Sequence, residues 1–228
     1  MRLLTYNVRS LRDDSDAVAR VIRAARPDVV AIQEAPRFLR WRSKCAALAR
    51  RSGLVIVGGG RPAAANLLLS SLAVDVESTR DVLFSKDFGL HQRGAALAVL
   101  RVGGVRVAVA GTHLDLVEAP RLRHLDELDG ALTGFVPDGV PVIVAGDVND
   151  QPGSSTWQRL AEHRADADPA GFTYSATDPV RRIDGVFADP AVRIVSAEVI
   201  GSPDVTIASD HRPVLVELDL SAGPAPAS

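Results

Sequence analysis

The chain has 228 residues, of which 46% are hydrophobic and 24% are charged, so it can bury a sizeable core as one large domain or two small ones. The net charge of −2 argues against a protein whose affinity rests on a broad cationic surface, although a local basic stripe needs no net charge. The single cysteine, Cys45, excludes an intramolecular disulfide, and we expect it to be half-buried on a helix.

Short β-rich runs alternate with helical ones along the chain. In the first half the pattern predicts strands over Leu3–Val8, Val29–Gln33, Leu54–Val57, Leu67–Ser71 and Val74–Phe84, and helices over Ser15–Ala25 and Arg37–Arg51. In the second half it predicts strands over Ala95–Arg101, Val105–Thr112, Val140–Ala145, Ile183–Phe187, Val192–Val199 and Pro213–Leu220, and helices over Glu118–Leu132 and Thr156–His163. The glycines between the first two of these strands, Gly103-Gly104, indicate a tight hairpin.

The composition does not change along the chain in a way that marks a domain boundary. We therefore expect one domain over residues 1–220, followed by a disordered tail over 221–228. The central strands are apolar along their length, which indicates that both of their faces are covered. The chain shows no signal-peptide pattern and no apolar run near the roughly 20 residues that cross a bilayer, so we expect a soluble protein in the reducing cytoplasm.

Six of the predicted apolar runs end in carboxylate, amide or imidazole side chains. These are Asn7, Gln33 with Glu34, His113 with Asp115, Asp147 with Asn149, Asp184, and Asp210 with His211. One such end is most simply a turn, but six of the same kind indicate a convergent site on strand-end loops. The oxygen-rich set suits Mg²⁺ or Mn²⁺ rather than zinc. A hard cation beside histidines favours phosphoryl chemistry, in which the metal neutralises charge and a base prepares the attacking water.

In this order, the segments "TYN", "QE", "THLD", "GDVN", "RIDGVF" and "SDHRPV" resemble those of the endonuclease/exonuclease/phosphatase superfamily. That group includes DNase I-like nucleases, abasic-site endonucleases, neutral sphingomyelinases and inositol polyphosphate 5-phosphatases. The resemblance runs from Leu3 to about Leu220. It implies an α+β fold of the DNase I type, a four-layer α/β/β/α sandwich with two packed mixed β-sheets and helices outside, and a site at one edge.

The resemblance also implies individual roles. Glu34, Asn7 and Asp210 would hold the metal. Asp147 would orient or deprotonate the attacking water, with Asn149 beside it on the phosphate. His211 would face the scissile phosphate, Asp184 would fix the tautomer of His211, and His113 would hydrogen-bond the phosphate. The choice of base between Asp147 and His211 stays open at this point. The structural alternatives are strand-end caps, turns and a packed His–Asp pair.

The chain departs from the family pattern in several places. Val148 stands where an aromatic residue usually follows "GD", and we expect it to point inward. Arg93 could contact substrate phosphate or lie on the surface, and Asp115 could join the site or cap its loop. We expect His124 on the surface.

A cluster of arginines follows Glu34, on the helix predicted over Arg37–Arg51. We expect it to form mainly a solvated helix face, with steering of an anionic substrate as the alternative; its members are Arg37, Arg40 and Arg42.

These patterns predict a phosphoesterase that depends on Mg²⁺ or Mn²⁺ and hydrolyses phosphodiester bonds in nucleic acid, a phospholipid headgroup or a small metabolite. The alternatives are a phosphomonoesterase of the same fold and an inactive binding or scaffold member. Inactivity is disfavoured because Glu34, Asp147, Asn149, Asp184 and His211 are all present. The sequence indicates no obligate protein partner and no transmembrane segment. A sequence-specific DNA-binding module would need a recognition helix or basic arm that the chain lacks.

Overall fold

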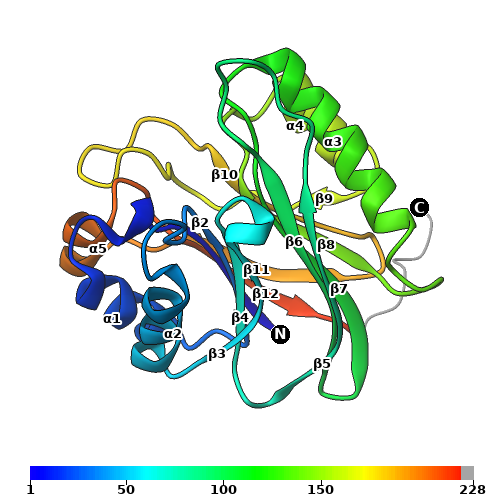
Figure 1. Cartoon of the computed structure of the whole chain (residues 1–228). Coiled ribbons are helices and arrows are strands. Elements are labelled where there is room, and N and C mark those ends of the chain that lie inside the picture. Colours follow the sequence, from blue (N-terminus) through cyan, green and yellow to red (C-terminus); the bar gives the residue numbers. More distant parts are fainter. Residues whose placement is uncertain (222–228) are drawn as a thin grey trace.

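The computed structural model describes residues 1–221, and its two β-sheets pack face to face between two groups of helices (Figure 1). This confirms the predicted α+β sandwich with two mixed sheets. Apart from Ser221, the predicted tail lies outside the described residues. Within residues 1–221, no helix combines the length and the apolar character that crossing a bilayer requires.

The first sheet has the strand order β11-β12-β1-β2-β4-β3. Only β1 and β2 are parallel to each other, and the other neighbours are antiparallel. The strands span β1 (Arg2–Asn7), β2 (Val29–Gln33), β3 (Val55–Gly60), β4 (Asn66–Ser70), β11 (Arg193–Val199) and β12 (Val214–Asp219). Strands from both halves of the chain therefore build this sheet.

The second sheet has the order β5-β6-β7-β8-β10-β9, and only β7 and β8 are parallel. Its strands span β5 (Val74–Leu83), β6 (Gly94–Val102), β7 (Val105–His113), β8 (Val142–Asp147), β9 (Ala165–Asp166) and β10 (Asp184–Ala188). The predicted hairpin between β6 and β7 is confirmed: Gly103 and Gly104 both have positive φ, 57° and 86°, as its tight turn requires.

Helices cover the outer face of each sheet. The first sheet is covered by α1 (Ser15–Ala25), α2 (Trp41–Ser52) and α5 (Pro203–Ala208), and the second by α3 (Glu118–Thr133) and α4 (Ser155–Ala161). Single 3₁₀ turns lie at Arg9–Leu11 and Arg61–Ala63. The residue before α1, Asp14, caps the helix by accepting hydrogen bonds from the backbone N–H groups of Asp16 and Ala17.

Three apolar layers hold the four structural layers together. The middle one lies between the sheets, where Leu3 and Leu68 of the first sheet share a cluster with Val109 and Ile143 of the second. The outer layers pack α1, α2 and α5 on one sheet and α3 and α4 on the other. The strands next to the middle layer are thus buried on both faces, which explains their unbroken apolar sequences.

The structure corrects several local expectations. The predicted helix over Arg37–Arg51 begins only at Trp41, because Arg40 has a φ of 58° and cannot continue a helix. Arg37 and Arg40 therefore lie in the preceding loop. Cys45 is fully buried, and burial raises the pKa of its thiol to about 11.

The expectation that His124 lies on the surface is also wrong. Its ring is buried and stacks on that of Phe84, with 5.1 Å between centroids. Helix α5 was not predicted, although Ser202 caps it and Pro203 opens it, because six residues are too few to show a helical period.

Candidate active site

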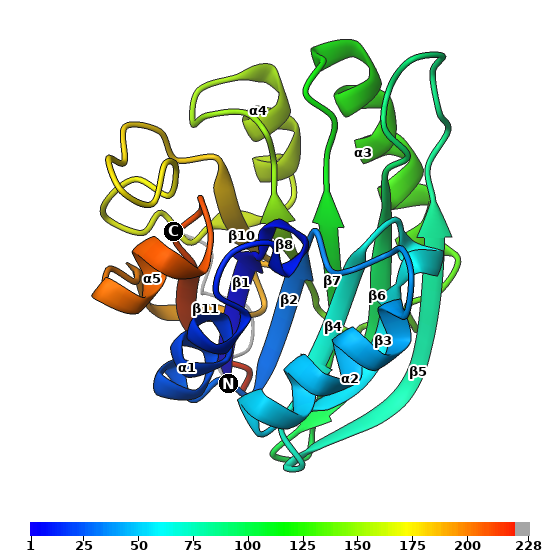
Figure 2. The same cartoon turned by 60° about the vertical axis from the view of Figure 1, so that its left-hand side comes forward.

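Two parallel strand pairs, one in each sheet, position the candidate site. In the first sheet Asn7 pairs in register with Gln33, and in the second His113 pairs with Asp147. The carboxyl ends of parallel neighbours meet at one edge of a sheet, and both pairs end at the same edge of the sandwich, the upper one in Figure 2. Polar side chains at four strand ends therefore converge.

Asp147, the last residue of β8, contacts residues from both sheets at this edge. Its Oδ2 atom accepts a hydrogen bond of 2.9 Å from Nδ2 of Asn7, which joins the two sheets. The same oxygen lies 3.3 Å from Nε2 of His113 and 3.7 Å from Nε2 of His211. Oδ1 accepts from the backbone N–H of Asn149 at 3.0 Å. Asp147 is 1% exposed, so these contacts set its orientation.

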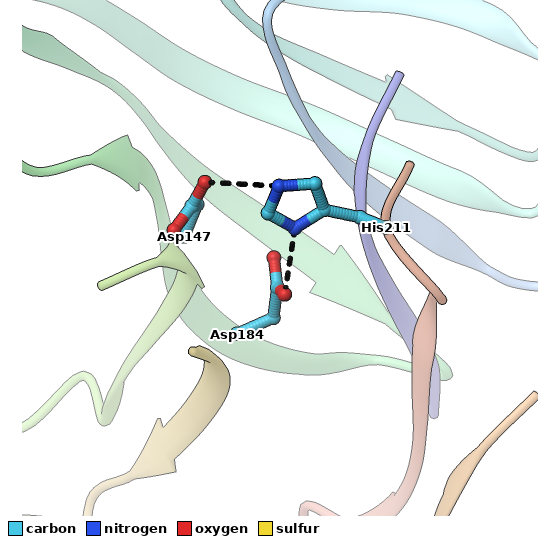
Figure 3. A group of neighbouring side chains, drawn as sticks. All are labelled: Asp147, Asp184 and His211. Atoms are coloured by element: carbon cyan, nitrogen blue, oxygen red, sulfur yellow. Dashed lines mark hydrogen bonds and ion pairs between the residues drawn. The ribbon is translucent and has the colours of Figure 1, made fainter. Parts of the chain in front are cut away.

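His211 lies between two carboxylates (Figure 3). Its Nδ1 is 2.9 Å from Oδ2 of Asp184, and its Nε2 faces Asp147 on the other side of the ring. Burial alone would lower the pKa of His211, but the charges of Asp184 and Asp147 outweigh it and raise the pKa to about 10. The ring is therefore an imidazolium at neutral pH, held in place by Asp184 and by the Tyr174 ring at 5.0 Å.

His113, in contrast to His211, is an uncharged imidazole. Burial lowers its pKa to about 3, and the attraction of Asp147 does not compensate for this. Nδ2 of Asn149 donates to the Leu114 carbonyl at 3.0 Å and lies 3.0 Å from Nε2 of His113. Nε2 of this neutral ring thus accepts from Asn149. The site combines one neutral and one cationic histidine around Asp147.

Glu34 and Asn7 form the second part of the site. Glu34 directly follows β2 with a φ of 51°, and Oε1 accepts from Nδ2 of Asn7 at 3.3 Å. Since the same amide nitrogen contacts Asp147, two carboxylates face one point. A glutamate backbone in the left-handed region of φ and ψ costs roughly 1–3 kcal/mol, and such conformations concentrate at functional sites. Asn149, with a φ of 55°, adopts this region more easily.

The other candidate residues lie close by. Asp210 is half-exposed, with Oδ2 at 3.4 Å from Nε of Arg9. Asp115 is buried and caps its own loop, because Oδ1 accepts from the backbone N–H of Val117 at 3.0 Å. Arg93 is 9% exposed, so the surface alternative for it is wrong. Val148 is buried against α4 and β10, as expected.

A pocket of about 640 Å³ opens over these residues. Its walls include seven of the ten candidates, namely Glu34, Arg93, His113, Asp147, Asn149, Asp210 and His211. Asn7 and Asp184 support the wall from behind, and Asp115 lies behind Arg93. The sequence did not reveal Tyr174 or Arg181, which also line the pocket. Both come from an irregular loop with no periodic signal, although Arg181 precedes the recognisable "RIDG".

Two groups of residues could hold a cation. Among residues 1–221, the carboxylates and imidazole of Asp147, Asp184 and His211 form the one cluster whose ligand atoms all lie within 4.8 Å of one another. The imidazolium of His211 already occupies its centre, which disfavours a metal there. Glu34 makes no ion pair within the described chain, and it faces Asp147 across the Asn7 amide. The carboxylate of Glu34, which no described cation balances, fits a hard cation together with the neighbouring oxygen of Asp147.

The family model of the endonuclease/exonuclease/phosphatase family matches residues 4–211. The chain belongs to this family. Escherichia coli (strain K12) contains a family relative, the uncharacterized protein YbhP, that is 31% identical over 173 residues, or 68% of this chain. The match spans 62% of YbhP, which is less than two thirds of its length.

Solved structures agree with this assignment. Mannosyl-6-phosphatase Bt3783 of Bacteroides thetaiotaomicron VPI-5482 superposes with a TM-score of 0.82 at 15% identity, covering 96% of this chain and 99% of that one. D. rerio TDP2 complexed with a single-strand DNA product superposes with a TM-score of 0.74 at 16% identity, covering 96% and 98%. At such identities the likeness shows a common endonuclease/exonuclease/phosphatase fold.

Proposed function

We propose that the chain is a metal-dependent phosphoesterase that hydrolyses phosphodiester bonds by in-line attack of water. The arrangement that carries this proposal is the imidazolium of His211, fixed between Asp184 and Asp147, in the same pocket as Glu34. It places a hydrogen-bond donor, an acceptor and a cation-binding carboxylate around one space. These are the groups that phosphoryl transfer requires.

Glu34 and Asn7 would hold the cation, with Asp210 at the open side of the pocket. Mg²⁺ or Mn²⁺ would neutralise charge that develops on the phosphate and leaving oxygens. The Asn7 side chain donates to both carboxylates in this structure, and rotation of its amide would turn the oxygen toward the cation instead. The oxygen-only donor set matches these two metals.

Of the two candidate bases, we assign the role to Asp147. The charges of Asp184 and Asp147 raise the pKa of His211 and so favour its protonated form, which donates a proton rather than accepts one from the attacking water. The carboxylate of Asp147 can accept that proton, while the backbone N–H of Asn149 holds the carboxylate in place. Attack and departure occur on opposite faces of the phosphorus in an in-line displacement. Since His211 Nε2 is 3.7 Å from Asp147, both act on one side, and His211 donates to a phosphate oxygen.

The remaining residues bind the phosphate. Arg93 lines the pocket, and its side chain donates no hydrogen bond within residues 1–221. His113 and Asn149 lie beside Asp147 and complete the wall of the pocket next to the Arg93 cation. Donors arranged before the reaction stabilise charge in the transition state without reorganisation.

Two alternatives remain from the sequence, a phosphomonoesterase and an inactive binding member. Of the two fold neighbours named above, one is a mannosyl-6-phosphatase and the other holds a single-strand DNA product. We favour the diester because the pocket continues into a second groove, where a further substituent on the phosphate can lie.

Hydrolysis of bis(p-nitrophenyl) phosphate and p-nitrophenyl phosphate tests the proposal, with Mg²⁺, Mn²⁺ or EDTA. We expect metal-dependent cleavage, faster for the diester, that falls roughly 10²–10⁴-fold in Asp147→Asn and His211→Ala. Circular dichroism and thermal unfolding check that both variants fold. Faster monoester cleavage would identify the phosphatase. The enzyme proposal would be overturned if the folded wild type hydrolysed neither compound, nor nucleic acids or lipids, with any of the metals.

A further inference from the structure

A second groove of about 620 Å³ continues from the catalytic pocket. The two share Arg37, Phe38, Ala64 and His91, so a molecule that leaves the pocket on this side enters the groove. Its walls come from the loop before α2, the 3₁₀ turn at Arg61–Ala63 and the β5–β6 connection. Figure 2 shows that connection rising at the same edge as the ends of β7 and β8. We call this space the basic groove.

The basic groove carries positive charge without carboxylate partners. Its cationic side chains are Arg37, Arg40, Arg61 and Lys86, none of which makes an ion pair with any described residue. Within the described part of the chain, no aspartate or glutamate lines the groove. The acid next to Lys86 in sequence, Asp87, is paired with Arg123 at 2.9 Å. These cations therefore remain available for an anionic partner.

The same groove exposes large apolar side chains. Phe38 is 72% exposed, Leu39 84% and Leu83 56%, and Phe88 is fully exposed at the tip of the adjoining β5–β6 connection. Single exposed apolar residues are ordinary, but several around one groove mark an interaction surface. The alternation of free cations with exposed phenylalanine and leucine is an amphipathic pattern rather than a purely electrostatic one.

The exposed β5–β6 connection is fixed at its base. Phe84 stacks on His124, and the Ser85 carbonyl lies 2.9 Å from Nε2 of that histidine. The backbone N–H of Ser85 donates to Glu127 at 2.7 Å. The fold therefore holds the tip outward through contacts with α3, and the exposure of Phe88 is not the result of an unanchored segment.

We infer that the basic groove docks on a membrane surface rich in anionic phospholipid, and that a lipid phosphodiester enters the catalytic pocket from it. The apolar side chains would bury in the interfacial layer while the cations pair with headgroup phosphates. The identity of the lipid as substrate rests on the proposed function, whereas the docking does not.

The apolar side chains favour a lipid surface over a nucleic-acid strand. Base stacking needs aromatic faces, and the groove offers Phe38, His91 and the half-buried Trp41, with the Arg37 guanidinium over the Phe38 ring at 5.3 Å. Leu39 and Leu83 give a base no stacking surface, but both can enter the acyl boundary of a bilayer. A nucleic acid would use the charges and leave these leucines in water.

Vesicle co-sedimentation in EDTA tests docking without turnover. The probes are vesicles of phosphatidylcholine alone and of phosphatidylcholine with phosphatidylglycerol, and the groove variants are Phe38→Ser/Leu39→Ser and Arg40→Glu/Arg61→Glu. Each cation near an anionic surface contributes about fivefold in binding. We expect salt-sensitive binding to the mixed vesicles alone, reduced at least tenfold in both groove variants.

Matched controls are Leu72→Ser and Arg23→Glu. Both residues are exposed, and Leu72 lies just past Ser70, which pairs with the start of β2 and so lies at the opposite edge of the sheet. We expect the controls to bind like wild type. Absence of vesicle binding, or equal loss in groove and control variants, would overturn the docking inference.

A fluorescent single-stranded oligonucleotide is the competing probe in the same buffer. Groove-dependent binding of the oligonucleotide without vesicle binding would replace the lipid by nucleic acid and overturn the inference. Activity on the generic diester separates the two proposals. An active protein that ignores vesicles loses only the docking inference, and a vesicle-binding protein inactive on all phosphate esters loses only the proposed function.

Discussion

Two buried arginines, Arg93 and Arg121, both contact Asp115, but they differ in how many of their side-chain N–H groups have an acceptor. Arg121 is 5% exposed, and its guanidinium donates to five acceptors. These are Thr156 Oγ1, Asp150 Oδ2 and the carbonyl oxygens of Asp115, Leu116 and Asn149. It thereby ties the loop that carries Asn149 to α3 and α4. Arg121 is therefore a structural residue that positions the loop behind the candidate site.

Arg93 makes no hydrogen bond through its side chain within the described chain. Its buried Nε lies 3.8 Å from Oδ2 of Asp115, too far for a hydrogen bond, and burial lowers its pKa. A buried guanidinium nitrogen without an acceptor is unfavourable for folding. Burial alone therefore does not distinguish the two roles. The number of satisfied donors does, and the unsatisfied arginine is the one that lines the pocket.

Replacement of Arg121 by methionine should have the largest effect on stability. It leaves the partly buried Asp150 carboxylate and three carbonyl groups without their donor, and each acceptor left unsatisfied costs about 1–3 kcal/mol. Urea unfolding measures the loss. A loss below about 1 kcal/mol would show that the five hydrogen bonds do not stabilise the fold as the comparison requires.

Arg93→Met is the matched variant, and its effect should fall on activity. We expect its unfolding free energy to stay within about 1 kcal/mol of wild type, because no intramolecular hydrogen bond is lost. Loss of one donor to the transition state should lower kcat/KM for the generic diester roughly 10²–10³-fold. Wild-type activity in this variant, or a stability loss equal to that of Arg121→Met, would contradict a substrate-binding role for Arg93 that differs from the structural role of Arg121.

Inorganic phosphate should stabilise the wild type through Arg93. At a phosphate concentration ten times the Kd, with Mg²⁺ present, linkage predicts about 1.4 kcal/mol of added stability. Thermal unfolding with and without phosphate should show this shift in wild type and in the exposed control Arg23→Met. A shift of the same size in Arg93→Met would assign the phosphate to other groups.

The smallest expected effect is a pH dependence of stability that comes from Asp150, the ion-pair partner of Arg121. Burial would raise the pKa of Asp150, but hydrogen bonds from Thr156 and Gln151 and the charge of Arg121 outweigh it and lower the pKa. Its folded pKa thus lies below the unfolded value of about 3.9, so its contribution to stability is complete above pH 4 to 5 and is lost as pH falls through the folded pKa. Asp150→Asn should therefore destabilise the protein at pH 7 more than at pH 3 in urea unfolding. An equal loss at both pH values would contradict the shift.

The sequence allowed most of the site to be predicted and little of its support. Asn7, Glu34, Asp147 and His211 stand at strand ends in recognisable segments, and the structure brings them together. The role of Arg121 cannot be predicted from the sequence, because it depends on acceptors that lie 5 to 35 positions away. The same reason explains the wrong expectation for His124, which Phe84 covers from another element. Local patterns carry no information about such distant partners.

Strand identity was likewise easier to predict than strand order. Alternating runs of valine, leucine and alanine mark β6 and β7, but apolar strands of equal length offer no signal for which ones pair. The pairing of β1 with β12 links residues more than 200 positions apart. It follows from packing of the whole chain rather than from any segment.

That pairing has a consequence for synthesis on the ribosome. The second sheet is built from consecutive strands, β5 to β10, whereas the first begins with β1 and is completed only by β11 and β12. His211 lies just before β12, so the imidazole reaches the pocket together with the strand that covers the open edge of β1. A nascent chain that has not yet released β12 exposes a strand edge that can pair with other chains, and its candidate site lacks His211. Completion of the sheet and assembly of the candidate site are therefore the same event.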